Sequence, residues 1–113
     1  MGYVTIASTG NASDFGDLSV ARSDLGSCSS VLRGLFVGGT TGSNSDVIDY
    51  ITIASTGNAS DFGNLSAAKA FIGATGSGTR ALFGGGTDNN QLNVIDFVTF
   101  ATAGNASDFG DLT

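Results

Sequence analysis

The chain has 113 residues, of which 18 are glycine, ten are acidic and four are basic, so the formal net charge is −6. This balance excludes the positively charged stripe that a nucleic acid requires and disfavours an anionic membrane surface. Histidine is absent, which removes the imidazole base of a Ser-His-Asp triad, and the single cysteine provides neither a disulfide nor a thiolate metal cluster. We therefore expect no cofactor, no bound metal and no enzymatic activity, and neither a nucleic-acid nor a membrane partner.

The sequence repeats with a period of 47 residues. Residues 3–19 return as residues 50–66 with two changes, and they return again as residues 97–113. The segments between these copies, 20–49 and 67–96, align with each other without any insertion. Strand-rich repeats of about 40 to 50 residues are typical of β-propeller blades.

Each repeat contains four short apolar or β-branched runs bounded by turn residues. In the first complete repeat the expected strands are 25–30, 33–38, 47–54 and 61–66. The third run alternates Asp49 and Ile51 on one side with Ile48 and Tyr50 on the other, the period of two that indicates a strand. No run has the 3.6-residue periodicity of an amphipathic helix, so the predicted fold class is all-β, with a β-sandwich of duplicated hairpins as the alternative to a propeller.

One group of motifs resembles the kelch repeat. These motifs are RGLFVGG at 33–39, DVIDY at 46–50 and AR at 21–22, and the second copy has RALFGGG at 80–86, NVIDF at 93–97 and AK at 68–69. The tryptophan that usually follows the tyrosine strand of kelch repeats is missing, and Phe62 is the nearest aromatic counterpart. Near-identical tandem repeats of this Gly, Asn, Asp and Ser-rich kind also resemble repeats in the tail fibres of marine bacteriophages and in metagenomic proteins. The resemblance implies a kelch-like β-propeller of four-stranded antiparallel blades.

The repeat divides the chain into about two and a half blades of one incomplete propeller domain. These are an outer half blade of two strands at 1–19 and full blades at 20–66 and 67–113. A propeller ring needs about four blades or more. We therefore expect either a piece of a longer protein or a homo-oligomer, as a ring or as an open-ended assembly joined through unpaired strand edges.

The kelch resemblance also implies where a partner would bind. In kelch-like propellers the loops between the second and third strands, and those that enter each blade, lie on one face that often binds partners. The candidate partner-binding residues are Arg22, Lys69, Thr40, Asn44, Asp46, Asp88, Asn90 and Asn93. The alternative role for Arg22 and Lys69 is an ion pair with an aspartate of a neighbouring blade.

Two further chemistries are alternatives to a role in turns. The carboxylate pair Asp14 and Asp17 could perform acid-base catalysis, but Asn64 replaces the second acid in the next copy, and a role in turns is favoured. Calcium would suit the oxygen-rich segments 10–17 and 87–91, but neither has the spacing of an EF-hand loop.

The sequence as a whole predicts a non-enzymatic structural or binding module that self-associates, belongs to a phage or bacterial surface structure, and presents loops to a glycan or a protein. A virion or an extracellular location follows from that resemblance. The alternatives are a fragment of a glycan-active propeller enzyme or lectin, and an excised or designed repeat.

Overall fold

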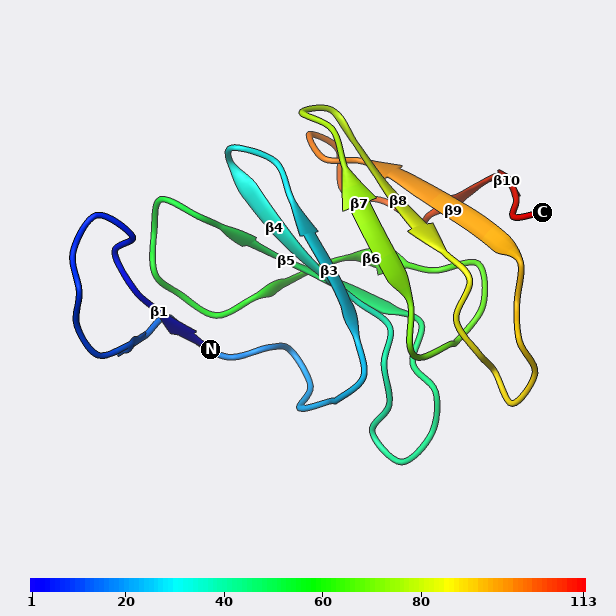
Figure 1. Ribbon diagram of the computed structural model, residues 1–113, viewed down its shortest axis with the longest axis horizontal. Coiled ribbons are helices and arrows are strands. Elements are labelled where there is room, and N and C mark those ends of the chain that lie inside the picture. The colour runs from blue at the N-terminus through cyan, green and yellow to red at the C-terminus, as the bar shows by residue number, and fades with distance from the viewer.

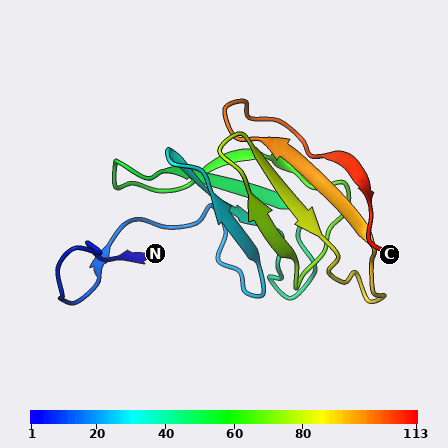
Figure 2. The ribbon, with the colours of Figure 1, turned by 45° about the horizontal axis from the view of Figure 1, so that its top comes forward.

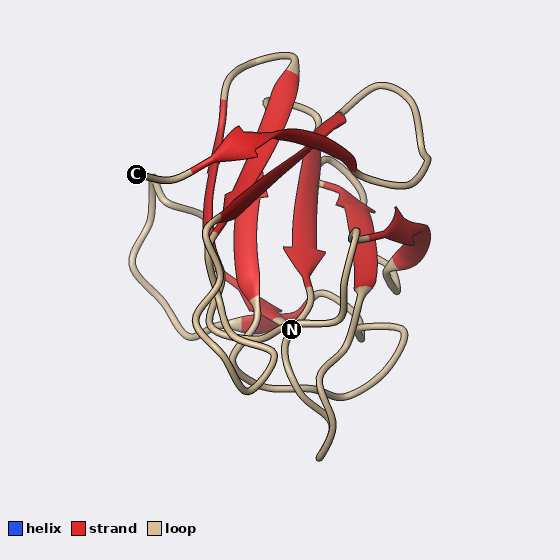
Figure 3. Cartoon of the chain, turned by 90° about the vertical axis from the view of Figure 1, so that its right-hand side faces the viewer, coloured by secondary structure: helices blue, strands red, loops and turns tan.

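The computed structural model describes residues 1–113, which form ten β-strands and no helix (Figure 3). None of its segments is therefore a helix that could cross a membrane. The strands are β1 (Gly2–Tyr3), β2 (Ser13–Asp14), β3 (Gly26–Ser29), β4 (Arg33–Val37), β5 (Val47–Thr52), β6 (Ser60–Asn64), β7 (Gly73–Gly76), β8 (Arg80–Gly84), β9 (Val94–Thr99) and β10 (Ser107–Asp111). The all-β fold class is confirmed.

The eight strands from β3 to β10 form two four-stranded antiparallel sheets (Figure 1). Their orders are β3-β4-β5-β6 and β10-β9-β8-β7, so each sheet is a meander in which consecutive strands are neighbours. We call them the first and the second sheet. The predicted runs of the first complete repeat correspond to β3, β4, β5 and β6, with boundaries that differ by at most two residues. Each full repeat thus folds into one sheet of blade-like topology.

The register of the strands gives each sheet two distinct faces. In the first sheet Leu35 lies opposite Tyr50, and Phe36 lies opposite Asp49. Because side chains alternate along a strand, one face carries Leu35 and Tyr50, which we call face A, and the other carries Phe36 and Asp49, which we call face B. The predicted alternation of the third strand is confirmed.

The hydrophobic core lies between the two sheets. Face A of the first sheet supplies Leu35, Val37, Ile48, Phe62 and Leu65 to the core. The second sheet and its entry supply Ile72, Ala81, Phe83, Val98 and Phe100. In the second sheet, face B is the face of Phe83 and Asp96, the equivalents of Phe36 and Asp49. The second sheet therefore turns face B toward the first, and the edge strands β3 and β7 lie side by side (Figure 1).

The first 19 residues contribute only the short pair β1 and β2. This pair lies at one end of the long axis of the molecule, and β10 lies toward the other end (Figures 1 and 2). The T-shaped ring pair of Tyr3 and Phe15 has its counterparts in the sheets, where Tyr50 contacts Phe62 and Phe97 contacts Phe109. The three copies of the repeated outer segment therefore share local packing.

Candidate functional site

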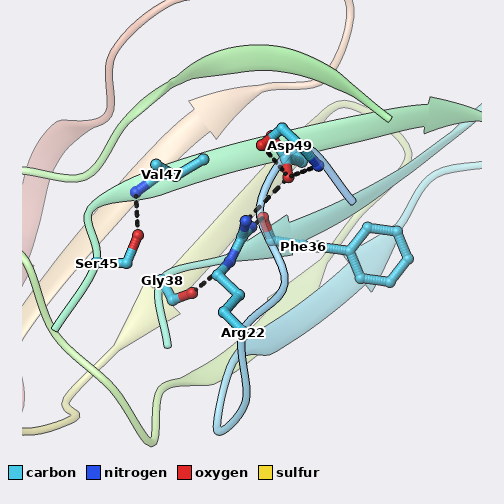
Figure 4. A network of polar contacts seen from close by, with 7 residues as sticks. Arg22, Phe36, Gly38, Ser45, Val47 and Asp49 are labelled. Carbon is cyan, nitrogen blue, oxygen red and sulfur yellow. Dashed lines mark hydrogen bonds and ion pairs between the residues drawn. The ribbon is translucent and has the colours of Figure 1, made fainter. Parts of the chain in front are cut away.

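A buried ion pair joins strand β5 to the segment that precedes β3 and contains Ser19 and Arg22, which we call the entering segment of the first sheet. An Arg22 guanidinium nitrogen, Nη1, lies 3.0 Å from Oδ2 of Asp49, and neither side chain is accessible to solvent (Figure 4). The Ser19 hydroxyl donates to the same carboxylate at 2.7 Å, and the Ser19 backbone N–H donates to it at 3.1 Å. We call Ser19, Arg22 and Asp49 the first ion-pair cluster.

Arg22 uses its remaining donors on the backbone of β4 and the turn that follows it. Its Nε donates to the Gly38 carbonyl at 2.7 Å, and Nη2 donates to the Phe36 carbonyl at 3.0 Å. Figure 4 shows the guanidinium between these carbonyls and Asp49. The planar guanidinium can satisfy all three acceptors at once because its donors form a rigid fork.

The second sheet contains the same arrangement 47 residues later. Ser66 donates its hydroxyl to Asp96 at 2.7 Å, and the Lys69 ammonium lies 3.4 Å from the Asp96 carboxylate. Lys69 and Asp96 are buried, and no buried side-chain nitrogen or oxygen in the protein lacks a hydrogen-bond partner. We call Ser66, Lys69 and Asp96 the second ion-pair cluster. It lies on face B of the second sheet, which turns toward the first.

These clusters correct the expected exposure of Arg22 and Lys69. Both were candidates for a partner-binding face, yet their charged side chains are buried against Asp49 and Asp96. The alternative role, an ion pair with aspartate, is the one observed. However, the aspartate belongs to the same 47-residue repeat rather than to a neighbouring one, because the entering segment folds back onto face B of the sheet that it begins.

Exchanging the cation of the first cluster will separate the contribution of the fork from that of the charge. Arg22→Lys keeps the charge but cannot reach Asp49, Phe36 and Gly38 together, so we expect the free energy of unfolding to fall by about 1 to 3 kcal/mol. Lys69→Arg is the matched exchange and should cause no loss. Urea unfolding of both variants measures the difference, and equal stability of Arg22→Lys and the parent would exclude a role for the two carbonyl contacts.

The other candidate residues lie on or beside two polar loops, which join β4 to β5 and β8 to β9. Thr40 forms isolated β-bridges with Ser23 and Asn44, and Thr87 forms isolated β-bridges with Ala70 and Gln91. Thr40, Asn44, Asp46 and Asp88 are half-buried, whereas Asn90 and Asn93 are exposed.

The first of these loops also contacts the segment that enters the second sheet. The Lys69 backbone N–H donates to the Ser45 carbonyl at 3.1 Å, and the Gly39 N–H donates to the Lys69 carbonyl at 3.0 Å. The structure therefore brings the loops and entering segments together at one end of the sheets, with polar side chains exposed there.

A second repeated contact joins the outer edges of successive repeats. The turn between β5 and β6 packs against the segment that follows β2. Asn58 accepts a hydrogen bond from the Asp17 N–H at 2.9 Å, and the Ala59 N–H donates to the Asp17 carbonyl at 2.8 Å. One repeat later, Asn105 accepts from the Asn64 N–H at 3.1 Å, and Ala106 donates to the Asn64 carbonyl at 2.8 Å. We call each of these a turn-to-edge contact.

The single cysteine, Cys28, is half-buried. Burial raises the pKa of the Cys28 thiol from 9.0 to about 11, which keeps it protonated and weakly nucleophilic at neutral pH.

A groove of about 360 Å³ lies between the two sheets. Arg33 is the one charged side chain that lines it, and Arg33 donates a hydrogen bond to the Phe100 carbonyl at 2.7 Å. No three acidic or cysteine side chains come together as a metal site.

The sequence interpretation missed the serines and aspartates of the ion-pair clusters. A usable signal was present, because Asp49 stands within an apolar, β-branched strand, where a buried carboxylate requires a partner. The same Ser, Arg or Lys, and Asp recur in each full repeat. The turn-to-edge contacts were also missed, because they join segments 41 residues apart in the sequence.

No protein-family model matches the chain, and no curated protein matches it.

Proposed function

We propose that the chain is a non-catalytic structural and binding module, a segment of a kelch-like β-propeller whose blades associate with further copies. The observation that carries this proposal is the equivalence of the junctions between repeats. Two consecutive repeats form the same four-stranded meander, and the ion-pair clusters and turn-to-edge contacts recur at equivalent positions in successive repeats. Units that contact only their neighbours, through a constant junction, are built to be extended by more of the same unit.

The side chains that could act in catalysis are either held in other contacts or poorly reactive, which supports a role without catalysis. Asp49 and Asp96 are the buried carboxylates, and each is held by a serine and a cation. A general base must instead be free to approach the proton that it abstracts. The raised pKa of the Cys28 thiol likewise makes it a poor nucleophile.

The loops 40–46 and 87–93 are the part of the module that we assign to binding. They carry hydroxyl and amide side chains and lie at one end of the stacked sheets, so further repeats would add further copies of the same loop. Repeated polar loops suit a glycan or a protein surface, where several weak contacts combine into a firm attachment. This matches the resemblance to phage and bacterial surface structures, and the proposed location is a virion or the extracellular space.

Light scattering over a concentration series tests the self-association. We expect species heavier than the single chain of 11.2 kDa, with a share that rises with concentration. A well-folded monomer at every concentration would contradict this part of the proposal. A screen of glycoside and ester substrates tests the rest, since turnover of any of them by the parent chain would identify an enzyme.

A further inference from the structure

The surfaces at the two ends of the stacked sheets are complementary, because each is one half of a junction that the chain already makes internally. In the internal junction, Val98 and Phe100 of the second sheet and Phe62 and Leu65 of the first belong to one hydrophobic core. All four side chains are at most 5% exposed. This is the arrangement that both end surfaces lack.

The equivalents of these side chains are exposed at opposite ends of the molecule. Val4 and Ile6, which correspond to Val98 and Phe100, are 53% and 98% exposed. Phe109 and Leu112, which correspond to Phe62 and Leu65, are 52% and 49% exposed. Figure 1 shows the N-terminal strand pair at one end of the molecule and β10 toward the other. Four large apolar side chains thus lie in solvent, although their equivalents are buried at the junction of the two four-stranded sheets.

The polar half of the junction is also unused at both ends. Residues 10–12 repeat the turn whose second copy, 57–59, contacts the edge at Asp17, and they make no hydrogen bond within the chain. No atom lies within 4 Å of where a Gly110 side chain would be, whereas its counterpart Gly63 lies directly against the Gly104 carbonyl. The backbone groups around Gly110 are therefore accessible to a docking turn.

Beside Leu112, face A of the second sheet forms an open groove of about 380 Å³. Its lining includes Leu82 and Ile95, the equivalents of the core residues Leu35 and Ile48. The exposed apolar surface therefore extends from β10 across face A of the second sheet.

We infer that a second copy of the chain docks head to tail, its residues 4–12 covering β10 and face A of the second sheet. Val4 and Ile6 of the second copy pack on Phe109 and Leu112, and its Asn11 accepts the hydrogen bond of the Asp111 N–H. This inference rests on the proposed self-association and specifies the surfaces that perform it. The contact is heterologous, so it either closes into a ring or propagates.

Two variants block opposite halves of this junction. Ile6→Asp places a charge on the docking segment, and its side chain is too exposed to affect folding. Gly110→Ala places a methyl group where the docking turn must approach, as the close contact of Gly63 with Gly104 demonstrates. Val31→Asp, at another exposed β-branched apolar residue, and Gly42→Ala, at another open glycine of positive φ, are the matched controls.

Light scattering of the full chain gives a distinctive expected pattern. Ile6→Asp alone and Gly110→Ala alone should remain monomeric, while an equimolar mixture should form a one-to-one dimer and nothing larger, because only one competent junction can form. Both controls should assemble like the parent. Leu112→Asp is a second variant of the receiving surface, to be used with Ile6→Asp if Gly110→Ala melts well below Gly42→Ala.

The outcomes separate this inference from the function on which it rests. If the parent assembles and both variants assemble equally well, self-association stands and this junction is wrong. If the parent remains monomeric at every concentration, self-association and the junction fall together. Assembly of either single variant into any species larger than the monomer would also overturn the head-to-tail arrangement.

Discussion

Asp49→Asn will lower the free energy of unfolding by about 3 to 5 kcal/mol, because it leaves the buried Arg22 charge without a counter-ion. The carboxylate of Asp49 accepts from Ser19 at 2.7 Å and pairs with Arg22 at 3.0 Å, with no access to solvent. Asparagine has the same shape, so packing is preserved and the loss reports on charge and hydrogen bonding. Small domains are stable by only about 5 to 15 kcal/mol, so the variant should lose a large part of the protein's total stability.

Denaturant unfolding followed by circular dichroism measures this effect. Asp61→Asn is the matched control, because Asp61 is exposed and should change stability by less than about 0.5 kcal/mol. The double variant Arg22→Met with Asp49→Leu should recover part of the loss, since an apolar pair of similar volume removes both desolvated charges. A cost below about 1 kcal/mol for Asp49→Asn would mean that the cluster does not hold the entering segment in place.

Gly63→Ala will destabilise the protein by about 1 to 3 kcal/mol more than Gly110→Ala, although the two glycines are equivalent in sequence and conformation. Their φ angles are +157° and +156°, so the backbone strain that alanine introduces is the same at both. At Gly63 the added methyl group would also collide with the carbonyl of Gly104, whereas at Gly110 it would meet open space. The difference between the variants therefore isolates the turn-to-edge contact.

Thermal and urea unfolding of the two variants, measured below the concentration at which the parent associates, test this comparison. Gly63→Ala should also expose Phe62, which is buried beside the contact, and so increase the binding of a hydrophobic dye. Equal losses of stability in the two variants would show that strain alone matters and that the contact between repeats contributes nothing.

How much of this could be predicted from the sequence depends on the range of the interaction. The strands of each repeat and the alternation of Ile48 and Asp49 across β5 were predictable, because strand formation and side-chain alternation depend on neighbouring residues. The resemblance to kelch repeats led to the same four-stranded unit. The candidate site was less predictable from the sequence. Arg22 and Lys69 were expected at a partner-binding face, but their charged groups are buried in ion pairs.

The 47-residue period, the four strands of each full repeat and the all-β class were determined by the sequence alone. Only the tertiary structure decided which face of one sheet packs on the next, that Asp49 faces Arg22, and that Gly63 lies against Gly104. The physical reason is that these contacts join residues 27 to 41 positions apart, through the twist and stacking of whole sheets. A local pattern specifies that a strand will form, but the surface that it meets depends on where the chain returns.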